Sequence, residues 1–176
     1  MNKNNSVVSL FTAAGILGIA ILAAMWMALG AIPAEAAGDP IVIIVNNSNP
    51  VDNLSMGELK KLFLSDRSRW DTGKAVAPVM LTPGVAERTS FLKIVCGMSD
   101  ADLSKYFMQA AFTGKSATPP KEVGSASAVK AFVASSPGAI GFVKGLDFHG
   151  DGSDGGIKAV KIDGAAPGDA GYKLKM

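Results

Sequence analysis

The sequence has little of what enzymes and metal proteins need. Among its 176 residues are one cysteine, Cys96, and one histidine, His149. A single thiol excludes an internal disulfide, and a lone histidine without a spaced partner argues against a zinc site. Neither residue has an evident partner for nucleophilic catalysis, and the motifs GxxxxGK[ST], HExxH and GxSxG are absent. The sequence therefore predicts a non-enzyme that uses no metal and no cofactor.

The net charge of the chain is also small. The chain has 17 Lys and Arg against 15 Asp and Glu, a net charge of +2, and charged residues make up 18% of it. That charge is too small for a dedicated nucleic-acid binder, which needs a concentrated basic face. Without its apolar first 36 residues, the chain has an ordinary globular composition, and a domain of that size can bury a core without disulfides or metals.

One long apolar run at the start of the chain indicates where in the cell the protein is found. The run from Val7 to Leu29 carries no charge, follows Lys3, and precedes an Ala-Glu-Ala site that ends at Ala36. A basic start, an apolar core and such a site are typical of a secretory signal peptide. The run is longer than usual, and as a helix of about 35 Å it would span a bilayer. Residues 1–36 are therefore expected to be a signal peptide or a retained membrane anchor, and residues 37–176 an exported domain.

Apolar runs alternate with capped helices over the exported part. Ile41–Val45 is a continuous β-branched run, typical of a strand buried on both faces, and Ser55 and Glu58 form a capping box. The expected strands are 41–45, 76–81, 139–143 and 157–162, and the expected helices begin after Ser55, near Val85, at Asp100 and after Ser125. This order predicts an α/β domain with a central mixed or mostly parallel sheet flanked by about four helices.

The order of several segments matches a known family. The segments are LSMGELKKLFLSDRSRW, RTSF, YFMQAAFTG, PP, SSPGAIGFV and IDGAAPGDAGYKL. Over about residues 41–174 the chain resembles the phosphate-type periplasmic substrate-binding proteins of ABC transporters, and it is similar to only the second of their two lobes. The resemblance implies a single-lobe fold, a periplasmic location and a small oxyanion such as phosphate as ligand. It also implies ABC-transporter membrane subunits, a second lobe or a second copy as partners.

Two turns are candidate ligand sites, because ligands of open α/β sheets lie beyond the carboxyl ends of the strands. The turn from Thr82 to Val85 precedes a helix whose free N–H groups and dipole favour an anion, and Gly84 lets a ligand approach the backbone. The alternative is an ordinary helix start. Asn46, Asn47 and Ser48 follow the first strand and could also donate hydrogen bonds, although such residues often only satisfy their own turn.

Arg88 stands one turn into the helix that follows Thr82–Val85. In the family, this helix start carries Ser-Gly-Thr, often followed by an Arg and then by a Phe three residues on. Arg88 and Phe91 match, whereas the three positions before Arg88 hold Val, Ala and Glu, which removes two hydroxyls and adds the carboxylate of Glu87. Arg88 could grip an oxyanion bidentately, or it could be a solvated residue of the outer face. The predicted ligand-binding residues are Thr82, Gly84, Val85, Arg88, Thr89, Asn47 and Ser48.

Two further features have competing interpretations. Trp70 could stack on a ligand, or it could pack over the edge of the core with its N–H on a loop carbonyl. The stretch 147–156 has the alternating pattern of a calcium loop, but Ile162 stands where the closing Glu is needed, so a surface turn is predicted.

Two functions are compatible with these observations. One is an exported solute-binding domain for a small oxyanion, serving an ABC-type uptake system. The other is an interaction or sensory module that reuses one binding-protein lobe and is held at the membrane by residues 7–29.

Overall fold

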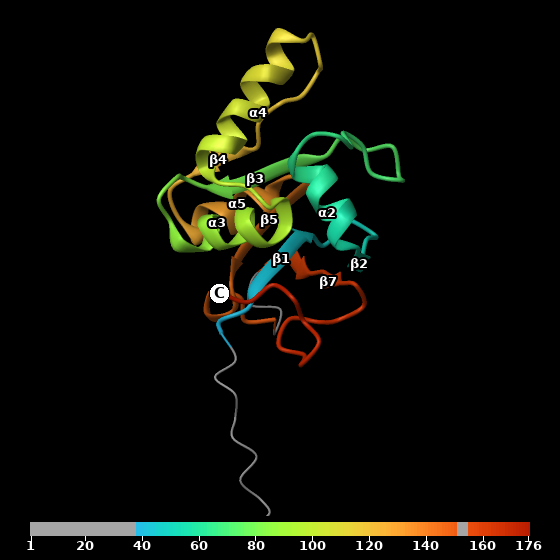
Figure 1. Cartoon of the computed structure of the whole chain (residues 1–176). Coiled ribbons are helices and arrows are strands. Elements are labelled where there is room, and N and C mark those ends of the chain that lie inside the picture. Colours follow the sequence, from blue (N-terminus) through green and yellow to red (C-terminus); the bar gives the residue numbers. More distant parts are fainter. Residues whose placement is uncertain (1–37, 151–154) are drawn as a thin grey trace, which may run out of the picture. The chain divides into compact units, whose positions relative to one another are not determined.

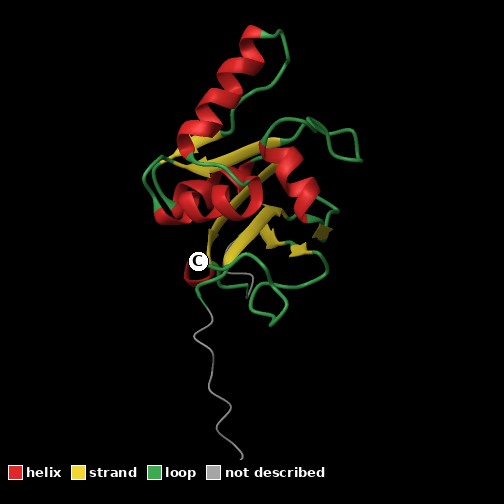
Figure 2. Ribbon diagram, in the orientation of Figure 1, coloured by secondary structure: helices red, strands yellow, loops and turns green. Residues whose placement is uncertain are grey.

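A five-stranded mixed sheet organises the structure, a computed structural model that describes residues 38–150 and 155–176 (Figures 1 and 2). The strand order is β4 (Lys121–Val123), β3 (Ala77–Leu81), β5 (Ala139–Lys144), β1 (Ile41–Asn46) and β6 (Ile157–Ala159). The β3 strand runs parallel to β4 and β5, whereas β1 runs antiparallel to β5 and β6. The predicted α/β class and the mixed sheet are confirmed.

Parts of the sequence prediction lie outside the described residues. These are the apolar run 7–29 with its cleavage site and the middle of the predicted surface turn at 147–156. Within 38–150 and 155–176, no helix is both long and apolar enough to cross a membrane.

Helices cover both faces of the sheet, as the side chains of β5 show. Gly141 lies against α5 (Ala126–Ser135), with Val129 and Val133 close to its backbone. The next residue, Phe142, points to the other face because successive side chains of a strand alternate. There its ring stacks on Phe91, with centroids 4.2 Å apart.

The second face is covered by two helical segments. They are α2 (Met56–Phe63) and α3 (Ala86–Phe91), which continues directly into the π-helical η1 (Leu92–Cys96). Phe63 of α2 packs 4.6 Å from the ring of Phe91, so three aromatic rings join both helices to β5.

The helix α4 (Asp100–Phe112) projects away from the sheet (Figure 1). It begins with a capping box in which Ser99 and Asp102 bond reciprocally, and Gly114, with φ of +71°, follows its end. Its outer part leaves Met108 and Phe112 exposed. The predicted start of this helix is confirmed.

The expected strand 157–162 is wrong as a single element. The chain divides at Val160, whose N–H donates to the carbonyl of Ile43, and the next N–H donates to Asp52. The chain therefore leaves the main sheet after β6. It forms β7 (Lys161–Ile162), which pairs in parallel with β2 (Asn53–Leu54) in a separate two-stranded sheet. The apolar pattern predicts a strand here but cannot show a change of partner.

Substitution of Gly141 by alanine tests how closely α5 packs on the sheet. The Cβ of Gly141→Ala would lie 2.7 Å from Cγ1 of Val129 and 2.9 Å from Cγ1 of Val79, and both valines are fully buried. Overpacking of this kind costs about 1–3 kcal/mol, so the free energy of unfolding should fall by that amount.

The matched control is Gly57→Ala in α2, where a Cβ would meet nothing within 4 Å. Here alanine should raise the free energy of unfolding by about 0.5–1 kcal/mol through its better helix propensity. Chemical denaturation of both variants measures the two effects. Equal effects of the two substitutions would contradict this packing.

Candidate functional site

The carboxyl ends of β4, β3 and β5 meet at one edge of the sheet, because these strands are parallel. The backbone N–H of Thr82, just after β3, donates to the carbonyl of Val123, the last residue of β4, at 3.0 Å. Lys144 ends β5 at the same edge. The predicted turn Thr82–Val85 therefore lies where ligands of open α/β sheets bind.

Two helices begin at this edge. The helix α3 follows Val85, whose side chain makes no capping hydrogen bond, and α5 follows Ser125, whose Oγ accepts from the N–H of Ala128 at 3.2 Å. Gly84 is exposed and has φ of +89°, a conformation that glycine adopts without strain. The N–H groups of a first helical turn lack partners within the helix, so both starts provide donors at this edge.

The carboxylate of Glu87 has a partner at the same edge. Lys144 Nζ lies 3.2 Å from Glu87 Oε1, and the two side chains are 32% and 14% exposed. The negative charge that distinguishes this turn from the family pattern is therefore balanced by a lysine. Sequence reasoning missed Lys144, and it missed the turn of Gly124 and Ser125 as part of the edge. The sequence carried a signal for that turn, a Gly-Ser pair directly before a helix.

Arg88 is buried, with 2% of its surface exposed. Its Nε donates to Asp100 Oδ1 at 2.5 Å, and its Nη1 donates to Glu122 Oε1 at 2.6 Å and to the carbonyl of Leu81 at 2.7 Å. The interpretation of Arg88 as a solvated residue is therefore wrong. Its predicted grip on an oxyanion stays a prediction, and any such ligand would compete with two carboxylates that Arg88 already holds.

The structure does not bring Asn47 and Ser48 together with Thr82 and Gly84. Because β1 is antiparallel to β5, the end of β1 lies at the opposite edge of the sheet. There Asn46 Oδ1 accepts from both the backbone N–H and the Oγ of Ser48, at 2.9 and 2.7 Å. The Nδ2 of Asn46 donates to the carbonyls of Val133 and Ala134 in α5. These contacts match the alternative in which such residues satisfy their own turn.

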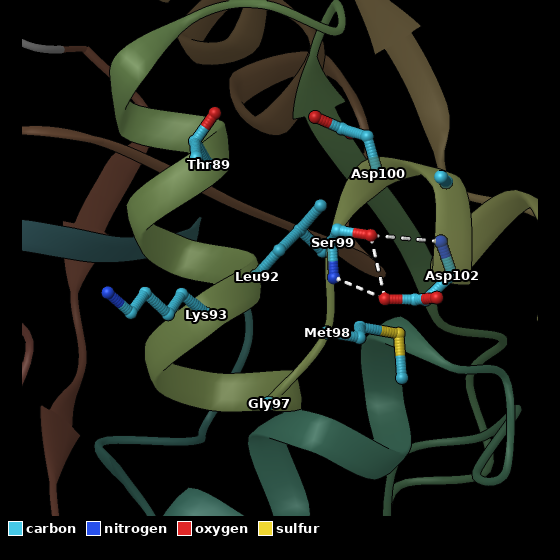
Figure 3. Close-up of a pocket in the computed structure, with 9 residues that line it drawn as sticks. Thr89, Leu92, Lys93, Gly97, Met98, Ser99, Asp100 and Asp102 are labelled. Carbon is cyan, nitrogen blue, oxygen red and sulfur yellow. Dashed lines mark hydrogen bonds between the residues drawn. The ribbon is translucent and has the colours of Figure 1, made fainter.

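A cavity of about 490 Å³ lies between η1 and the start of α4, and Thr89 lines it (Figure 3). Ser99 and Asp102 line it and form the capping box at the start of α4, and Lys93 points away from them. The hydrogen bonds from Ser99 lower the pKa of Asp102. Asp100, the other carboxylate of the cavity, pairs with Arg88. Because both carboxylates carry negative charge into the cavity, it suits an oxyanion less well than the edge at Thr82.

The remaining candidates are structural. Burial raises the pKa of Cys96 to about 11, so its thiolate is scarce near neutral pH. Trp70 is buried and its Nε1 donates to the carbonyl of Gly138 at 2.9 Å, which confirms the interpretation of a core-edge tryptophan. In the parts of the chain that the structure describes, no group of three or more His, Cys, Asp or Glu could hold a metal ion.

Removing the Arg88 side chain should strongly destabilise the domain. Arg88→Ala leaves Asp100, Glu122 and the carbonyl of Leu81 without their shared partner, so the free energy of unfolding should fall by about 2–4 kcal/mol. Arg69→Ala is the control, because the Arg69 side chain is exposed and donates to the carbonyl of Gly73, and its effect should stay within about 0.5 kcal/mol. Chemical denaturation measures both, and similar losses in the two variants would show that Arg88 does not join these elements.

No protein-family model matches the sequence, and no curated protein matches it. Solved structures do match the fold. An ABC-type phosphate transport receptor from Vibrio cholerae superposes with a TM-score of 0.59 at 23% identity, over 74% of this chain and 49% of that chain. A putative phosphate ABC transporter substrate-binding protein from Clostridium perfringens, solved with bound phosphate, gives 0.59 at 21% identity, over 74% and 48%. PstS from Borrelia burgdorferi gives 0.61 at 12% identity, over 79% and 55%.

These likenesses concern the backbone arrangement. They cover most of this chain and about half of each matched protein, as expected for one of two lobes. The described domain thus has the fold of one lobe of the phosphate-type ABC transporter substrate-binding proteins, and the chain spans about half the length of the proteins it matches.

Proposed function

We propose that this is an exported solute-binding domain that holds a small oxyanion, such as phosphate, for an ABC-type uptake system. The observation that carries the proposal is the convergence of three parallel strand ends and two helix starts at one edge of the sheet. Fold likeness to proteins named for phosphate transport supports the choice of ligand class.

Backbone donors are the main ligand groups in this proposal. The N–H groups of α3 that follow Val85 and those of α5 that follow Ser125 provide partial positive charge without any cationic side chain. The hydroxyls of Thr82 and Ser125 add donors, and Lys144 adds a positive charge when an anion competes with Glu87 for it. A site built from backbone groups tolerates the absence of the family's Ser-Gly-Thr sequence, because N–H groups do not depend on the side chain.

In this proposal, Arg88 holds the turn at Thr82 in position and does not itself contact the anion. Its contact with the carbonyl of Leu81 lies at the last residue of β3, directly before the turn that begins at Thr82. The ion pairs of Arg88 with Asp100 and Glu122 hold that strand end against α4 and β4. Arg88 is thus a positioning residue that keeps the turn in place while the backbone binds the anion.

The edge covers an anion from one side only, since Pro83 and Gly84 are exposed. Ligand sites usually bury most of the ligand surface, so tight binding requires a second surface. We propose that this surface comes from another lobe, from a second copy or from the membrane subunits of the transporter. Export by residues 1–36, as a signal peptide or as an anchor, stays a prediction.

Thermal unfolding tests the ligand. The full chain is heated in chloride buffer with and without phosphate, sulfate or other oxyanions at matched ionic strength. A ligand at about 100 times its Kd adds roughly 2.7 kcal/mol, which should raise Tm by about 10 °C for a domain of this size. A rise with one oxyanion supports the proposal, and no rise with any of them contradicts binding by this domain alone.

A charge at the start of α5 tests the site. Asp and Asn cap a helix about as well as Ser, so Ser125→Asp and Ser125→Asn should both fold with nearly unchanged Tm in chloride. Only the aspartate places a negative charge beside the bound anion. The Tm rise should therefore disappear in Ser125→Asp and persist in Ser125→Asn. An equal oxyanion response in the two variants would place the ligand elsewhere.

A further inference from the structure

A second cavity, of about 320 Å³, opens at the other end of β3, where that strand enters the sheet. Its walls come from the end of α2 and the loop after it, the start of β3, the segment that leads into β4 together with the first residue of β4, and α5. The strand β3 runs away from this cavity toward Thr82, so the cavity and the proposed oxyanion edge lie at opposite ends of the strand. The function proposed above does not use the cavity.

The polar lining of the cavity is basic and rich in hydroxyls. Four hydroxyl residues, two cations and no acidic residue line it. The hydroxyl residues are Ser65, Ser68, Ser116 and Thr118, and the cations are Arg67 and Lys121. Hydroxyls and cations together favour an oxyanion, because each can donate to it. Leu62, Val76 and Pro78 give the same cavity an apolar part.

Lys121 is the cation best placed for a ligand. Its Nζ lies 4.3 Å from the ring centroid of Phe132, so a cation–π contact holds the ammonium at the cavity wall. Among the described residues, no carboxylate lies within ion-pair distance of it. Arg67, in contrast, already pairs with Asp71 at 2.5 Å and donates to the carbonyl of Arg69. Its charge is partly balanced, so Lys121 provides most of the attraction for an anion.

The two loops that form the cavity are fixed to each other. Ser65 Oγ donates to the carbonyl of Thr118 at 2.5 Å. Next to this contact, Lys115 Nζ and the hydroxyl of Tyr106 both donate to Asp66 Oδ1, at 2.5 and 3.0 Å. The hydrogen bond from Lys115 is the main reason that the pKa of Asp66 is lowered. A cavity with fixed walls loses little conformational entropy when a ligand binds.

We propose that this cavity binds a small organic anion, with its oxyanion group on Lys121 and the hydroxyls of Ser116 and Thr118. The apolar part of the ligand then lies against Leu62 and Val76. The volume is at the lower end of the range for small-molecule sites, which limits the ligand to a compact molecule. The walls of this site come from several elements of the same domain.

Phenyl phosphate is a suitable probe, because it combines an oxyanion with a compact apolar group. We expect titration of the isotope-labelled full chain with phenyl phosphate, followed by amide NMR, to shift the signals of residues 116–118, Lys121 and Phe132 with saturation. The neutral probe benzyl alcohol should leave them unchanged at the same concentrations. Inorganic phosphate reports on the other site through Gly84 and Ser125, so failure of one proposal is distinguishable from failure of the other.

Two matched variants decide the role of the cation. Lys121→Gln should weaken phenyl phosphate binding at least tenfold, as expected for the loss of a charge-assisted contact. Lys161→Gln removes an exposed lysine on β7, which does not line the cavity, and should leave the affinity unchanged. The amide spectra show whether each variant is folded. The proposal is overturned if the amide signals of residues 116–118 and Lys121 do not respond to phenyl phosphate, or if both variants bind it as tightly as the unmodified chain.

Discussion

The buried guanidinium of Arg88 is the interaction on which the arrangement of this domain depends. A buried charge must be paired, and this one joins α3 to the end of β3, the start of α4 and the middle of β4. The helix α4 projects away from the sheet, and the ion pair of Asp100 with Arg88 is one of the contacts that anchor its start (Figure 1). The segment that follows α4 leads into β4 and forms part of the second cavity. The Arg88 side chain thus supports the turn at Thr82 and, through the start of α4, the segment that leads to the cavity at the opposite end of β3.

Strand direction decides what each edge of the sheet can do. With β4, β3 and β5 parallel, their carboxyl ends bring two helix starts together, and backbone donors accumulate there. The antiparallel strand β1 sends Asn46–Ser48 to the other edge, where the amide of Asn46 bonds α5 instead of a ligand. Donor groups of similar chemistry therefore have different uses, because the direction of one strand separates them.

The sequence predicts features that depend on neighbouring residues better than those that depend on distant ones. The buried run of β1, the capping box at Ser55 and the helix start at Asp100 are local patterns, and the structure confirms them. A continuous apolar run is the same in a parallel or an antiparallel strand, so the direction of β1 had no local signal. The partners of Arg88 lie 12 and 34 residues further along the chain. The strand β4 was missed because it has three residues and little apolar character.

The two proposed anion sites differ in which parts of the structure surround the ligand. At the edge near Thr82, the donors are backbone groups on one open surface, so affinity depends on whatever covers the other side of the anion. The cavity at Lys121 has walls from four parts of the same domain, and ion pairs and hydrogen bonds already hold two of its loops. In the proposal for this cavity the ligand contacts all come from the described domain, whereas the proposed site near Thr82 needs a second surface to enclose its ligand.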